Sequence, residues 1–220
     1  MLLVFDMDGT LTDGDSWAFT NAHFGTKNVH INDYLHGRIS YDRYLELVHS
    51  QWISSKGSTV YYEDLEEAVK GIVARPGLDE LLSFARRNEW KTGIISAGID
   101  SLSDRFLRDY DFDFALANGF EFVDGGGKRE LTGKGVPRVP LLEKGRLVEE
   151  MAGKEPVVSV GDTIYDVPMF RRSLVSVAMA PKDSACASNA TMVINDETFY
   201  PLIDRFEELL QEQANRPEHK

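Results

Sequence analysis

Short apolar runs recur along the chain and predict the strands of a buried sheet. The first run, residues 2–5, ends at a cluster of aspartates and a glycine, and further runs lie at 92–95, 157–160, 175–179 and 192–194. A continuous apolar run bounded by turn residues is typical of a strand that is buried on both faces.

Helical patterns separate these runs. Apolar residues at 78, 81, 82 and 85 follow the spacing of one helix face. Similar spacing recurs in three later stretches, at 102–106, 142–151 and 202–210. Strands that alternate with helices favour a parallel sheet with helices on both faces. We therefore expect an α/β fold with a three-layer, Rossmann-like core.

Residues 14–75 interrupt this alternation after the first strand. They are mostly helical in pattern and hold 8 acidic and 6 basic residues, so most of the net charge of −12 lies outside them. We expect a small helical cap subdomain at 14–75, inserted after the first strand. The core then consists of 1–13 and 76–211, and the polar residues 212–220 form a frayed tail.

A hairpin is expected near the middle of the chain. Residues 114–122 and 128–132 have the composition of strands, and Gly125, Gly126 and Gly127 lie between them. A nucleotide-binding glycine loop is the alternative, but the required glycine spacing and following helix are absent.

The composition excludes several classes of protein. There are 36 acidic and 24 basic residues and no long basic cluster, so we expect no nucleic-acid partner and no membrane partner. Cys186 is the only cysteine, and we expect it to be a buried core residue. Asp6 and Asp8 interrupt the apolar start before a signal peptide or membrane span is reached, which indicates a cytoplasmic protein.

Two aspartate clusters follow predicted strands. Asp6, Asp8 and Thr10 come directly after the first strand, and Asp162 and Asp166 follow the strand at 157–160. An isolated Asp-x-Asp is equally well explained by a polar turn. Two such clusters at the same edge of a parallel sheet would repel each other unless a cation lies between them, and Mg²⁺ is the expected ion.

Two further segments suit a phosphate group. Ser96, Ala97 and Gly98 follow the strand at 92–95 and precede a helix that we expect Asp100 to cap, so a hydroxyl and backbone N–H groups face an anion. Lys144 opens another predicted helix and supplies positive charge. Taken singly, Ser96 is explained by a turn and Lys144 by a solvated surface charge.

These residues together resemble the haloacid dehalogenase-like (HAD) superfamily, in its phosphoserine phosphatase-like branch. The resemblance covers nearly the whole chain, since the first motif lies at residues 6–10, the second at Ser96, the third at Lys144 and the fourth at 161–166. It implies a HAD-like core with a helical cap after the first motif, which agrees with the position of residues 14–75.

The resemblance also implies a reaction. Asp6 would form an aspartyl-phosphate and Asp8 would act as general acid and base. Mg²⁺ would be bound by Asp6, the backbone carbonyl of Asp8 and Asp162, with Asp166 as an additional or supporting ligand. The phosphate-binding residues would be Thr10, Ser96, Ala97, Gly98 and Lys144. Because dehalogenases lack an acid at the position of Asp8, the chain is expected to hydrolyse a small phosphomonoester.

The substrate is less constrained. Asp15 lies where phosphoserine phosphatases place an acid for the substrate amine, but Val48 occupies the position of the arginine that binds the substrate carboxylate. We therefore hypothesise a small phosphorylated metabolite other than phosphoserine. Its specificity contacts would be Asp15, Trp17, Tyr41 and His49, although helix packing equally explains the last three.

Three alternatives remain at this stage. A phosphomutase or phosphotransferase would use the same residues with a different phosphoryl acceptor. A signalling receiver domain also combines acidic residues with a lysine, but it is about half this length and has its acceptor after a central strand. A catalytically silent phosphate-binding protein on the same fold would not need competent residues at all four motifs. The oligomeric state is not predicted.

Overall fold

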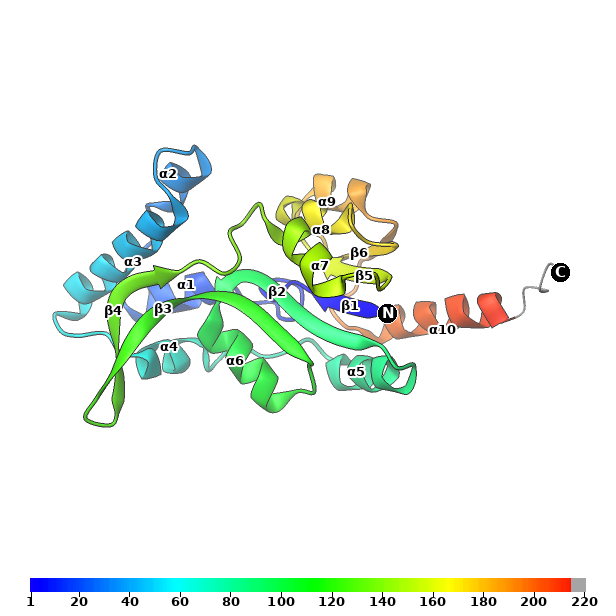
Figure 1. Ribbon diagram of the computed structural model, residues 1–220, viewed down its shortest axis with the longest axis horizontal. Helices are drawn as coiled ribbons and strands as arrows, with labels where there is room; N and C mark the ends of the chain where they lie inside the picture. The colour runs from blue at the N-terminus through cyan, green and yellow to red at the C-terminus, as the bar shows by residue number, and fades with distance from the viewer. Residues whose placement is uncertain (215–220) are drawn as a thin grey trace.

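The computed structural model describes residues 1–214, and its sheet has the strand order β4-β3-β2-β1-β5-β6-β7 (Figure 1). The central strand β1 pairs in parallel with β2 and β5, and only β4 is antiparallel to its neighbour. The five predicted strands are confirmed. The strands are β1 (Leu2–Phe5), β2 (Lys91–Ile99), β3 (Phe114–Gly125), β4 (Lys128–Val136), β5 (Val157–Gly161), β6 (Val175–Met179) and β7 (Met192–Ile194).

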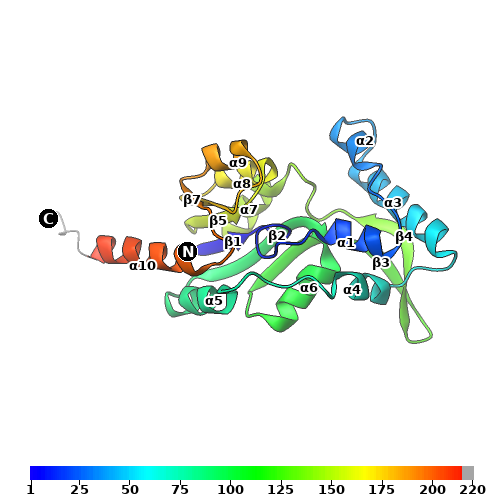
Figure 2. The ribbon, with the colours of Figure 1, turned by 180° about the vertical axis from the view of Figure 1, so that it is seen from behind.

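Helices cover both faces of the sheet, as Figures 1 and 2 show. One layer contains α5 (Leu78–Arg87), α6 (Asp100–Asp109) and α10 (Tyr200–Ala214), and the other contains α7 (Lys144–Ala152), α8 (Val167–Phe170) and α9 (Ser184–Asn189). Alternate residues of β1 pack into the two layers: Leu3 and Phe5 belong to the core under α5 and α10, and Leu2 and Val4 to the core under α7 and α8. The three-layer α/β class is confirmed.

The first four of the five helices between β1 and β2 form the end of the molecule opposite α10 (Figure 2). They are α1 (Ser16–His23), α2 (Ile31–Leu35), α3 (Tyr41–Lys56) and α4 (Tyr62–Val69). Local signals define their ends. The Asp15 side chain caps α1 by accepting a bond from Ala18 N, and Ser40 caps α3. Gly57, at φ 70°, ends α3 in the left-handed conformation.

The predicted hairpin is present but longer than expected, and it has a second role. The first part of β3 pairs with β2, and the strand then continues beyond the end of β2 to pair with β4. Phe120 and Leu131 of this arm pack with Leu45 and Trp52 of α3 in one apolar cluster. A Cβ at Gly135 would lie 2.5 Å from the Leu45 side chain, so the glycine permits this close packing.

Asp100 does not cap the following helix as the sequence suggested. β2 continues through Ser96–Gly98 to Ile99, because the Ile99 N–H donates to Ser16 Oγ and Ile99 pairs with Asn118 of β3. Ile99 is the residue before α6 and has no capping side-chain bond, while the Asp100 carboxylate pairs with Arg138.

Three smaller expectations have different outcomes. Cys186 is fully buried, as predicted. The tail predicted at 212–220 begins inside α10, which runs to Ala214, and its residues 215–220 lie outside the described residues. Within residues 1–214, none of the helices combines the length and the apolar character needed to span a bilayer.

Candidate active site

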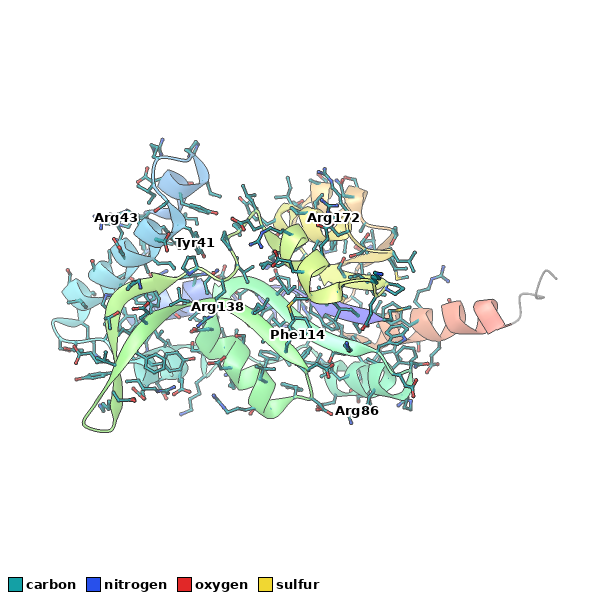
Figure 3. The ribbon with its side chains drawn as sticks, viewed as in Figure 1. Tyr41, Arg43, Arg86, Phe114, Arg138 and Arg172 are labelled. Carbon is teal, nitrogen blue, oxygen red and sulfur yellow. The ribbon has the colours of Figure 1, made fainter. Side chains whose placement is uncertain are left out.

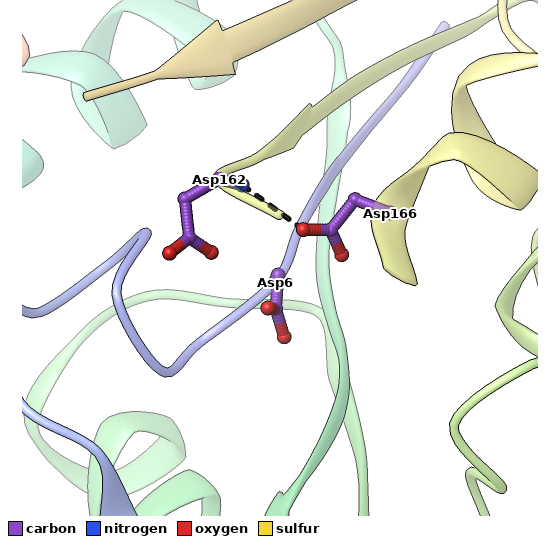
Figure 4. Close-up of side chains that lie close together, drawn as sticks. All are labelled: Asp6, Asp162 and Asp166. Atoms are coloured by element: carbon purple, nitrogen blue, oxygen red, sulfur yellow. Dashed lines mark hydrogen bonds between the residues drawn. The ribbon is translucent and has the colours of Figure 1, made fainter. Parts of the chain in front are cut away.

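The carboxyl ends of β1 and β5 bring three aspartates together, as Figure 4 shows. Asp6 directly follows β1, and its backbone N–H donates to Val160 O of β5, 2.9 Å away. Asp162 follows β5, and Asp166 ends the short helical turn after it. One carboxylate oxygen from each of the three lies within 4.8 Å of the others, and all three residues are buried.

The donor set suits a hard divalent cation. Asp6 Oδ1 and Asp162 Oδ2 are buried and make no hydrogen bond of good geometry within the described residues, although Lys144 Nζ lies 2.9 Å from the first and Lys182 Nζ 3.0 Å from the second. Carboxylate oxygens are ligands that Mg²⁺ prefers, and three carboxylates this close together are stabilised by positive charge. Burial raises the pKa of Asp162, and the nearby charge of Asp166 adds to this effect.

Asp166 differs from the other two carboxylates because both of its oxygens are engaged. Oδ2 accepts hydrogen bonds from the backbone N–H groups of Asp162 and Thr163, and Oδ1 accepts one from Lys144 at 2.6 Å. Burial raises the pKa of Asp166, and the Lys144 charge opposes this shift. Asp166 therefore fixes the loop that carries Asp162.

Lys144 is the buried cation of the site. It is 2% exposed at the start of α7 and forms ion pairs with both Asp6 and Asp166. Burial alone would lower the pKa of Lys144, but the attraction of Asp166 and Asp6 outweighs it, and the net shift is upward. The ammonium therefore stays charged and offsets part of the negative charge around Asp6.

The Asp8 carboxylate is held in place by Ser16. Ser16 Oγ donates to Asp8 Oδ2 at 2.6 Å, and the same hydroxyl accepts from Ile99 N. Gly98 lies so close that an added Cβ would be 2.6 Å from Asp8 Oδ2. Burial raises the pKa of Asp8 well above its usual value, and the Asp15 carboxylate raises it further.

Hydrogen bonds of two buried side chains also hold the loop after Asp6 in place. The Thr10 hydroxyl donates to Asp162 Oδ1 at 3.0 Å, so it orients a carboxylate in this structure. Buried Arg75 donates to the carbonyl oxygens of Gly9 and Thr10 at 2.9 and 3.1 Å. Gly9 has φ 83°, and a Cβ there would clash with both Lys182 and Asp162.

A cavity of about 400 Å³ opens above these residues. Asp6, Asp8 and Lys144 line it together with Ser96, Ala97 and Gly98. The segment 14–75 contributes much of the remaining wall, with Asp15, Trp17, Ile31, Leu35, Tyr41 and Tyr44. The cavity thus spans the carboxyl edge of the sheet and the inserted helices.

The four predicted specificity residues separate into two groups. Asp15, Trp17 and Tyr41 line the cavity, and Tyr41 lies at the start of α3 (Figure 3). His49 does not line it. Its ring packs 5.8 Å from that of Phe120, beside Gly133, and burial lowers its pKa. Val48 is also fully buried, in the apolar cluster of the cap.

Sequence reasoning missed Ser16, Arg75 and Lys182. Lys182 follows β6 at the same sheet edge as the aspartates, so a basic residue after a third parallel strand was an available signal. Ser16 and Arg75 lie near the two ends of the segment 14–75, where the sequence has no recognisable motif.

Comparison with known proteins agrees with this arrangement. A phosphoserine phosphatase of Archaeoglobus fulgidus is 30% identical over 191 residues, which cover 83% of this chain and 53% of that protein. One from Streptomyces coelicolor is 26% identical and covers 82% of this chain and 44% of that protein. The chain spans about half the length of these curated relatives.

Solved structures show the same fold. A phosphoserine phosphatase determined as a phospho-aspartyl intermediate analogue superposes with a TM-score of 0.72 at 21% identity, covering 93% of this chain and 97% of that one. A probable phosphoserine phosphatase from Vibrio cholerae gives a TM-score of 0.79 at 20% identity, covering 98% and 67%. The family model for haloacid dehalogenase-like hydrolases matches residues 3–171, and the chain therefore belongs to that family.

Proposed function

We propose that the protein hydrolyses a small phosphomonoester through an aspartyl-phosphate on Asp6. The observation that carries this proposal is the position of the Asp6 carboxylate, which is buried beside Lys144 and Asp162 and lines the cavity. A carboxylate attacks a phosphate dianion only where positive charge reduces their repulsion, and Lys144 provides such a charge. The similarity to phosphoserine phosphatases supports the same reaction class.

Asp6, Asp162 and the backbone carbonyl of Asp8 would bind Mg²⁺, and Asp166 would be a further ligand or hold the loop that carries Asp162. The buried oxygens Asp6 Oδ1 and Asp162 Oδ2, which have only the lysine ammonium groups beside them, support this assignment. When bound, the ion supplies the positive charge that draws the phosphoryl group toward the carboxylates.

The proposed hydrolysis has two steps, in which Asp6 and Asp8 have separate roles. An oxygen of Asp6 forms a bond to phosphorus, and the bond from phosphorus to the substrate alcohol oxygen breaks. Asp8 gives its proton to that oxygen. In the second step water attacks phosphorus, Asp8 takes a proton from the water, and the bond between phosphorus and Asp6 breaks, which releases inorganic phosphate.

The remaining assignments concern binding. Ser96, Lys144 and the backbone N–H groups of Ala97 and Gly98 would hold the transferred phosphoryl group, since all four residues line the cavity. Thr10 would contribute by orienting Asp162. Residues 14–75 would act as the cap over residues 1–13 and 76–211, because their helices supply the wall that faces the aspartates.

Hydrolysis of p-nitrophenyl phosphate tests the proposal. We expect Mg²⁺-dependent release of nitrophenol that EDTA abolishes, and a loss of at least ~10³-fold in Asp6→Asn. Asp124→Asn, which removes a carboxylate at the exposed end of β3, is the matched control and should keep wild-type activity. Undiminished turnover by Asp6→Asn, or turnover unaffected by EDTA, would contradict the proposal.

A further inference from the structure

The charges around the cavity are distributed unevenly. Among the described lining residues, the basic ones are Lys144 and Lys182, and both lie at the phosphate end, where they pair with Asp6, Asp166 and Asp162. Asp8, which would protonate the leaving alcohol, and Asp15 also line the cavity. No further basic side chain of the described lining is available to the alcohol part of the ester.

The aromatic wall has few free polar groups. Trp17 Nε1 donates to Ala97 O at 2.9 Å, and Tyr44 OH donates to Asn28 Oδ1 at 3.1 Å. The Tyr41 hydroxyl accepts from the side-chain amide of Asn118 at 2.9 Å. Because their polar tips are bonded to protein, these residues offer the cavity mainly ring surface, which attracts cations.

Asp15 is suited to meet such a cation. Its Oδ1 accepts from Ala18 N at 2.8 Å, so the carboxylate is fixed at the start of α1 while the residue stays exposed. A carboxylate on the substrate would meet the Asp15 carboxylate without a basic partner, whereas an ammonium group would be attracted by it.

We infer that the substrate is the phosphate ester of a small cationic alcohol, an amino or quaternary ammonium alcohol without a carboxylate. The inference rests on the proposed function and specifies its substrate class. Asp15 provides the ionic contact, and Trp17, Tyr41 and Tyr44 provide the surrounding ring surface.

A matched series of esters tests the inference through kcat/KM. Ethyl phosphate, O-phosphoethanolamine and O-phosphoserine differ by the stepwise addition of an ammonium group and then a carboxylate. We expect kcat/KM for O-phosphoethanolamine to exceed that for ethyl phosphate by about tenfold or more, and to fall again for O-phosphoserine. Equal values for the first two esters, or the highest value for O-phosphoserine, would overturn the inference.

The Asp15→Asn variant tests whether Asp15 is responsible for the preference for an ammonium group. Asparagine caps helices about as well as aspartate, so α1 should be retained while the charge is lost. We expect the ratio of kcat/KM between O-phosphoethanolamine and ethyl phosphate to fall about tenfold. The control is Asp42→Asn, an equal change of charge on the exposed start of α3, and it should keep the wild-type ratio.

The outcomes separate the two proposals. If p-nitrophenyl phosphate is hydrolysed and the ratio in Asp15→Asn equals that of the wild type, the inference is wrong and the proposed function stands. If the wild type hydrolyses neither p-nitrophenyl phosphate nor any of the three esters, the proposed function is wrong and the inference fails with it.

Discussion

At the scale of single residues, the sequence predicts some of the contacts between side chains at the site and not others. Asp6 and Asp162 follow short apolar strands, so their meeting at one sheet edge could be predicted from the chain alone. Ser16 could not, because its contacts to Asp8 and Ile99 depend on how α1 packs against the end of β2. Thr10 is predicted to contact phosphate, and its bond to Asp162 also depends on a residue far away in the chain.

The Ser16 hydroxyl gives a prediction at this scale. Ser16→Ala removes the hydrogen bond that positions Asp8, and an acid matters most when the leaving group is a poor one. We expect kcat for ethyl phosphate to fall roughly tenfold or more, with a much smaller fall for p-nitrophenyl phosphate, whose leaving group needs little protonation. Ser50→Ala on the exposed face of α3 is the control, and equal losses on both substrates would show that Ser16 has only a structural role.

At the scale of elements, the hairpin was foreseen but its packing was not. Its glycines and alternating strands are local signals, whereas the contacts of Phe120 and Leu131 with α3 join segments far apart in the chain. The end of β2 was missed for the same reason. Ser96–Gly98 has the composition of a turn, but pairing with β3 and the bond from Ile99 to Ser16 keep it extended.

Asp100, at the start of α6, gives a prediction about pH. Burial is the main cause that raises its pKa to about 6, and its ion pair with Arg138 (labelled in Figure 3) opposes the shift. The folded protein thus keeps a proton that the unfolded chain releases near pH 4. This carboxyl group therefore lowers stability as the pH rises from about 4 to about 6.

Asp100→Asn should remove this effect. Its free energy of unfolding, measured relative to wild type by urea denaturation, should increase by up to about 3 kcal/mol between pH 4 and pH 6 and then stay constant. Asp109→Asn, at the exposed end of the same helix, should show no comparable trend. A difference between Asp100→Asn and wild type that does not change with pH would contradict the assignment.

At the scale of the whole molecule, the negative charge is distributed unevenly along the chain. The segment 14–75 is nearly balanced in charge, and most of the net charge of −12 belongs to the rest of the chain. Three of those negative charges, on Asp6, Asp162 and Asp166, lie in one buried cluster. The order of strands and helices along the chain predicts the fold. That order does not predict which residues form the cavity wall, because the wall depends on how the inserted helices pack.

The covalent intermediate is the central claim at this scale, because the aspartate cluster, Lys144 and the cavity meet at Asp6. Asp8→Asn is the useful variant, since nitrophenolate leaves without an acid while water attack on the intermediate still needs a base. The phosphorylated enzyme should therefore accumulate when this variant turns over p-nitrophenyl phosphate.

The most direct measurement is mass spectrometry of Asp8→Asn after incubation with p-nitrophenyl phosphate and Mg²⁺, acid quenching and proteolysis. We predict one phosphoryl group on the peptide that contains Asp6, removed by hydroxylamine and absent when Asp6→Asn is also introduced. A phosphoryl group on another residue, or nitrophenol release with no phosphorylated peptide, would contradict the assignment of Asp6 as the nucleophile.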